Sequence, residues 1–102
     1  MSNQKTIASL FDEKPMQWNL RGDPHLWREM REHFDNVPLP SSPDELVALI
    51  ETAFHTLTGH HISEEQPFFT ERYNTGGMSS GMILPTFWRE KIIPLLVERS
   101  QI

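Results

Sequence analysis

Proline placement constrains the fold of this 102-residue chain more than any other feature of its sequence. Eight prolines are spread along it, and several of them stand at the start or end of an apolar segment. Proline has no backbone N–H and a fixed φ, so it is tolerated in the first turn of a helix and interrupts regular structure elsewhere. We therefore expect short elements that are separated by proline-containing turns.

A first helix is predicted where Asp23 supplies an N-cap and Pro24 occupies the first turn. From there to about Asp35, apolar residues recur every three or four positions. This spacing places them on one stripe of the helix, which is expected to face the core.

A second helix is predicted over residues 43–58. Ser42 and Glu45 have the spacing of a capping box, in which each side chain bonds a free backbone N–H near the other residue. Gly59 follows the apolar face and can take the left-handed conformation that ends many helices.

Three short strands are expected to form one small sheet. Residues 16–20 alternate apolar and polar side chains, which is typical of a half-buried strand. Residues 68–73 are rich in aromatic and other β-favouring types. Residues 81–84 would return antiparallel to them across a Gly/Ser-rich loop.

Helices are also predicted at the two ends of the chain. Residues 5–11 carry enough apolar side chains for a short amphipathic helix. Pro85 opens a last helix that is apolar over more than half of its circumference, so it is either buried on two sides or shared with another chain. Pro94 is expected to kink or split this helix.

These elements predict an α+β fold in the order α-β-α-α-β-β-α. A small antiparallel sheet of about three strands is packed against about four helices. The length supports a single compact domain over residues 1–102.

Charge and composition exclude several classes of function. Nine Lys and Arg against 14 Asp and Glu leave a formal charge of -5, with no long cationic cluster, so nucleic-acid binding is not expected. The chain has no cysteine, which excludes disulfides and thiolate catalysis. No segment reads as a secretion signal or a membrane span, so we expect a cytoplasmic protein without a membrane partner. No cofactor is indicated.

The loop over residues 73–82 is longer than a simple hairpin needs, and it is rich in glycine and serine. Its backbone N–H groups can cradle an anion or a side chain of a partner. The loop lacks the lysine of a P-loop and the spacing of a nucleophile elbow, so a catalytic role is not indicated. The candidate binding residues are Arg72, Tyr73, Asn74, Gly76, Gly77, Met78, Ser79, Ser80, Trp88 and Arg89.

Histidines and tryptophans are the other residues able to hold a ligand. His60 and His61 are adjacent, so their rings point in different directions, and they are interpreted as solvated loop residues. His25, Glu29 and His33 share one helix flank, which is interpreted as a solvated polar surface. No metal site is therefore predicted. The three tryptophans could form an aromatic ligand cage, but they are interpreted as core side chains: Trp18, Trp27 and Trp88.

These features favour a non-enzymatic cytosolic interaction or regulatory module. It would contact an unidentified protein partner through the 73–82 loop and the surplus apolar face of the last helix, and that helix could also form a homodimer. The alternative is a small-molecule or anion-binding protein, or a minor hydrolase, that uses loop amides with Arg72, Arg89 and one of His60 or His61. A third hypothesis is an acidic inhibitor or immunity-like protein that blocks a basic partner.

Overall fold

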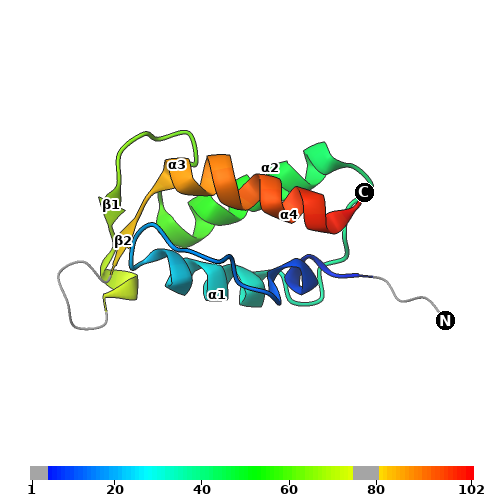
Figure 1. The fold of residues 1–102 in the computed structure, drawn as a ribbon, viewed down its shortest axis with the longest axis horizontal. Coiled ribbons are helices and arrows are strands. Elements are labelled where there is room, and N and C mark those ends of the chain that lie inside the picture. Colours follow the sequence, from blue (N-terminus) through cyan, green and yellow to red (C-terminus); the bar gives the residue numbers. More distant parts are fainter. Residues whose placement is uncertain (1–4, 75–80) are drawn as a thin grey trace.

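The computed structural model describes residues 5–74 and 81–102 and has the mixed helix-and-sheet architecture expected from the sequence. The helices run along the length of the molecule, the small sheet lies at one end, and the C-terminus lies at the other (Figure 1). In chain order the elements are a 3-10 helix over Ile7–Phe11, α1 (Asp23–His33), α2 (Pro43–Thr58), β1 (Phe68–Phe69), a 3-10 helix over Glu71–Tyr73, β2 (Met82–Ile83), α3 (Pro85–Phe87), a π-helical turn over Trp88–Ile92, and α4 (Ile93–Ser100).

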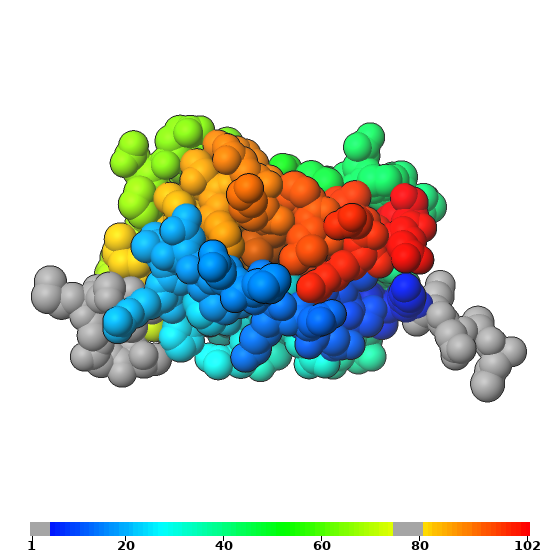
Figure 2. Space-filling model, in the orientation of Figure 1, coloured from blue at the N-terminus to red at the C-terminus, as the bar shows by residue number. Residues whose placement is uncertain are grey.

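One hydrophobic core joins the helices. Each helix turns its apolar stripe inward, and the N-terminal 3-10 helix packs against both α1 and α4, as Figure 2 shows on one face of the molecule. Removal of this apolar surface from water is the main force that favours the fold. The largest side chains that are fully buried are Trp88, Phe11, Phe54, Ile7, Leu26, Met30, Leu46, Ile50, Ile83, Ile92 and Leu96.

The predicted antiparallel return is confirmed, but its strands are shorter than expected. Phe68 pairs with Ile83 and Phe69 pairs with Met82. The remainder of the first predicted strand turns into the 3-10 helix Glu71–Tyr73, where the Thr70 side chain accepts a hydrogen bond from the N–H of Arg72.

The prediction of a third strand over residues 16–20 is wrong. This segment is irregular, Met16 is wholly exposed, and the sheet of the described residues has two strands. The N–H of Gly22 donates a 2.7 Å hydrogen bond to the carbonyl of Met82. This carbonyl of β2 is therefore already bonded by the turn before α1 and is not left for a neighbouring strand. Trp18 instead packs through its ring against Trp27. The alternation of apolar residues therefore does not mark a strand here: Trp18 packs on the core from an irregular loop, while Met16 faces solvent.

The second helix has the predicted ends. The Ser42 side chain accepts a hydrogen bond from the N–H of Glu45, and Gly59 ends the helix with a φ of 77°. The first helix is also confirmed, although it ends at His33, before the predicted Asp35, and the carboxyl of Asp23 turns back into the protein instead of capping.

The ends of the chain differ from the prediction in helix type. Ile7–Phe11 is a 3-10 helix. The last helix is split, as predicted from Pro94, into α3, the π-helical turn and α4. Because Pro94 has no N–H to continue the ladder, the register shifts just before it, and the N–H of Ile93 bonds the carbonyl of Trp88 five residues earlier. Within the described residues, none of the helices has the length and hydropathy needed to cross a bilayer.

Candidate functional site

The 73–82 loop, which the sequence favoured as the binding element, lies mostly outside the described residues. Gly76, Gly77, Met78, Ser79 and Ser80 belong to this undescribed part, so their role stays a prediction.

Tyr73 and Arg72 lie just before that part of the loop, and both contact α1. The Tyr73 side chain is buried, and its ring stacks on His25 with centroids 5.9 Å apart. Arg72 forms a 2.8 Å ion pair with Glu29. Asn74, which follows them, is exposed. His25 and Glu29, which were interpreted as part of a solvated polar surface, thus hold the 3-10 helix Glu71–Tyr73 against α1.

Arg89 and Trp88 have structural contacts that the sequence did not indicate. Arg89 donates to the carbonyl of Ile62 at 3.1 Å and to the carboxylate of Glu65 at 3.0 Å, so it fastens the loop that follows α2. Trp88 is wholly buried, and its Nε1 donates to the carboxylate of Asp23 at 2.9 Å. Both side chains are therefore engaged in internal contacts, and their role in binding stays a prediction.

The histidine loop is stabilised by its own contacts. His60 Nδ1 lies 2.9 Å from a carboxylate oxygen of Glu64, and the His60 ring stacks on Phe68 with centroids 3.8 Å apart. His61 stacks on His55 at 4.2 Å. The hydrogen bond from the backbone N–H of His61, and after it the bond with His60, lower the pKa of Glu64. Among residues 5–74 and 81–102, no three His, Asp or Glu side chains converge as metal ligands.

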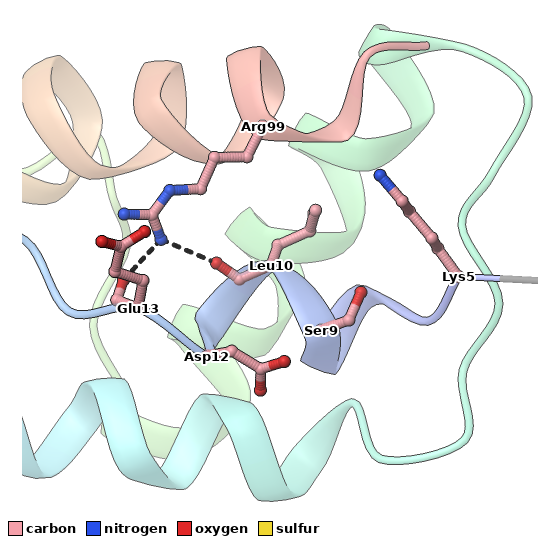
Figure 3. A pocket seen from close by; sticks show the side chains of 6 residues that line it. All are labelled: Lys5, Ser9, Leu10, Asp12, Glu13 and Arg99. Carbon is pink, nitrogen blue, oxygen red and sulfur yellow. Dashed lines mark hydrogen bonds between the residues drawn. The ribbon is translucent and has the colours of Figure 1, made fainter.

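A depression between the N-terminal 3-10 helix and α4 is closed by Arg99 (Figure 3). Its guanidinium donates to the carbonyl of Leu10 at 2.9 Å and to the carbonyl of Glu13. These carbonyls lie at and just after the end of the 3-10 helix, where they lack helical partners. The charge of Arg99 is thus used to join two segments, which argues against a ligand site at this depression.

The strongest candidate site is a pocket of about 260 Å³ between α1 and the irregular loop that precedes it. We refer to it as the aromatic pocket. It is lined by Phe11, Asp12, Lys14, Trp18, Pro24, Trp27, Arg28 and Arg31.

Packed aromatic rings form the floor of the aromatic pocket. The rings of Phe11 and Trp27 lie with centroids 4.7 Å apart, and Trp18 meets Trp27 edge to face at 5.6 Å. Phe11 and Trp27 are buried, whereas Trp18 is half-buried and has ring surface left in contact with solvent. Such tilted contacts fix ring positions and leave a rigid apolar surface for a ligand.

Three cations and one carboxylate line the aromatic pocket. Arg31 binds Asp12 through two nitrogens, at 3.1 and 2.8 Å. Within the described part of the chain, Arg28 has one polar side-chain contact, with the ring nitrogen of His25 at 3.3 Å, and neither Arg28 nor Lys14 has an ion pair. The pocket is therefore locally cationic on a protein whose net charge is -5.

The sequence indicated this site only in part. The tryptophans were interpreted as core side chains, and Trp27 and Trp88 are indeed buried, whereas Trp18 is half-buried against Trp27 and lines the pocket. The cations were missed because Lys14 precedes a predicted turn, while Arg28 and Arg31 lie on the polar side of α1. A tryptophan in a loop flanked by basic residues was the signal that could have indicated the site.

Comparisons with protein-family models, curated proteins and solved structures found no match to this chain.

Proposed function

We propose that this protein is a non-enzymatic interaction module that binds an acidic segment of a partner protein at the aromatic pocket. The observation that supports this proposal is an aromatic floor beside three cationic side chains that have only one carboxylate among them. An acidic segment with one apolar anchor complements both properties.

The size of the pocket favours a protein segment over a free small molecule. Pockets for drug-sized ligands have volumes of about 300 to 1,000 Å³. The aromatic pocket, at about 260 Å³, lies below this range and suits one side chain of a larger partner. Met16, on the same loop as Trp18, is wholly exposed, and exposed methionine adapts readily to an apolar partner surface.

Local charge decides recognition at short range. The net charge of -5 repels an acidic partner at a distance, but at physiological salt this repulsion is screened beyond about 8 Å. Among the residues that the structure describes, neither Lys14 nor Arg28 has an ion pair, so both can pair with carboxylates of the partner. Binding is expected to weaken as salt is raised, because such contacts lie at the exposed rim.

The test is calorimetric titration of the protein with a short peptide of glutamates around one central leucine. We expect this peptide to bind, and we expect neither the peptide with lysines in place of glutamates nor the peptide with serine in place of leucine to do so. Lys14→Glu and Arg28→Glu should each weaken binding by about tenfold.

Arg21→Glu is the matched control, since Arg21 is exposed and does not line the pocket. Equal binding of the lysine peptide, or equal weakening by Arg21→Glu, would contradict the proposal.

A further inference from the structure

The last helix carries a second surface that is independent of the aromatic pocket. A shallow depression of about 680 Å³ lies along α4 and is bordered on one side by Val47 of α2. We refer to it as the α4 groove. It is lined by Val47, Glu90, Lys91, Ile93, Pro94, Leu95, Val97 and Glu98.

The centre of the α4 groove is apolar. Leu95 and Val97 are half-buried and Pro94 is exposed, although the helix around them is otherwise well packed. This is the surplus apolar face that the sequence predicts for the last helix. An apolar centre with a charged rim is the usual anatomy of a protein interface.

Lys91 and Glu98 are the two free charges at the ends of this apolar centre. Both are exposed, and neither has an ion pair or a side-chain hydrogen bond within residues 5–74 and 81–102. They are seven residues apart, about 10 Å along the helix, which is too far for them to pair with each other. The third charge of the groove, Glu90, already pairs with Arg89.

The order of these residues makes the α4 groove complementary to itself. In a twofold dimer, residue i of one copy meets residue j of the other, and j meets i. The midpoint between Lys91 and Glu98 lies between Pro94 and Leu95. Two α4 helices packed antiparallel about that point therefore bring each Lys91 opposite the Glu98 of the second copy, with Pro94 and Leu95 between the two ion pairs.

We infer that a second copy of this chain occupies the α4 groove, as an antiparallel α4 to α4 dimer with reciprocal Lys91–Glu98 ion pairs. The charge pattern favours this occupant over an unrelated helix, because each copy supplies both a lysine and a glutamate at the spacing that the other copy needs. The inference does not depend on the aromatic pocket.

Sedimentation velocity on the full chain over a range of concentrations tests the dimer. We expect the wild type to dimerise and to dissociate on dilution. Lys91→Glu and Glu98→Lys should each weaken dimerisation by about tenfold or more, since each converts two attractive contacts into two repulsive ones. Circular dichroism establishes that each variant is folded.

An equimolar mixture of the two single variants gives the decisive result. The mixture places the introduced carboxylate of one copy opposite the introduced ammonium of the other, so dimerisation should return to within about twofold of the wild type. Leu95→Asp should abolish it, whereas Leu49→Asp, an exposed α2 position outside the groove, should not. A wild type that is monomeric throughout, or a mixture that stays monomeric, overturns the inference.

Discussion

Trp88 donates a 2.9 Å hydrogen bond from its indole nitrogen to the carboxylate of Asp23, and both side chains are wholly buried. The carboxylate also accepts from the N–H of Leu20 at 2.9 Å. This contact ties the start of α1 to the π-helical turn across the core. It also places an ionisable group where water does not reach it, which makes stability depend on pH.

Asp23 should make the folded protein less stable as the pH rises towards neutral. Burial raises its pKa from 3.8 to about 6, against the opposing effect of the hydrogen bonds from Trp88 and two backbone groups. Between these values the native state binds more protons than the unfolded state, so the contribution of Asp23 is largest below pH 3.8 and is lost as the pH passes 6.

Urea unfolding of the wild type and Asp23→Asn at several pH values tests this effect. Asparagine has the same shape and does not titrate, so the difference between the two proteins isolates the carboxyl. The stability of the wild type relative to Asp23→Asn should fall by roughly 3 kcal/mol from acidic to neutral pH. A difference that does not change with pH would contradict the raised pKa.

Tyr73→Phe should leave stability unchanged or raise it by about 1 kcal/mol. The hydroxyl of Tyr73 is buried beside the Arg72–Glu29 ion pair, without a hydrogen bond of good geometry to any described residue. Burial also raises the pKa of Tyr73 to about 12, so the group stays neutral. Thermal unfolding measures the change, and a clear loss of stability would show that the hydroxyl has a partner.

Gly22→Ala should destabilise the protein more than Gly59→Ala. A Cβ at Gly22 would collide with the carbonyl oxygen of Met82, which the backbone N–H of Gly22 already bonds at 2.7 Å. We expect a loss of about 2 to 3 kcal/mol there. A Cβ at Gly59 meets no atom, so only the left-handed φ of 77° opposes it, at about 1 kcal/mol. Denaturant midpoints rank the two variants, and the reverse order would contradict the close approach at Gly22.

Arg99→Met should loosen the N-terminal 3-10 helix while α2 stays protected. The variant keeps the apolar stem of the side chain but loses the bonds to the carbonyls of Leu10 and Glu13, with an expected cost of about 1 to 2 kcal/mol. Hydrogen exchange should accelerate over Ile7–Phe11 in particular. Arg99→Lys, which keeps the charge without the planar fork, should show a smaller effect. Equal acceleration throughout the protein would instead indicate a global loss of stability.

The sequence predicted helices better than the sheet or the site. The ends of α2 were predictable because the Ser42 side chain accepts from the free N–H of Glu45 and Gly59 takes the left-handed conformation that ends the helix, although the Glu45 carboxylate accepts from serine hydroxyls and not from a backbone N–H. The split at Pro94 was predictable for a similar reason, since a missing N–H acts within one turn. Each of these effects depends on residues close together in the chain.

The conformation of residues 16–20 was not predictable from neighbouring residues in the sequence. Its alternation predicted one buried apolar face, but Met16 is wholly exposed, and Trp18 is partly buried by ring packing and not by strand pairing. The outcome depended on Gly22, which approaches the Met82 carbonyl so closely that no side chain fits between them. A contact between residues this far apart in the chain has no local signal.

The sequence by itself thus determined the ends of α2, the apolar stripes of the helices and the absence of cysteine chemistry, because capping, periodicity and composition are local properties. Only the tertiary structure decided that Trp88 bonds the buried carboxyl of Asp23, that Arg72 and Arg89 are used in internal contacts, and that Lys14, Arg28 and Arg31 line one pocket with Trp18. The use of a charged or aromatic side chain depends on its neighbours in space, and packing of the core brings those neighbours together.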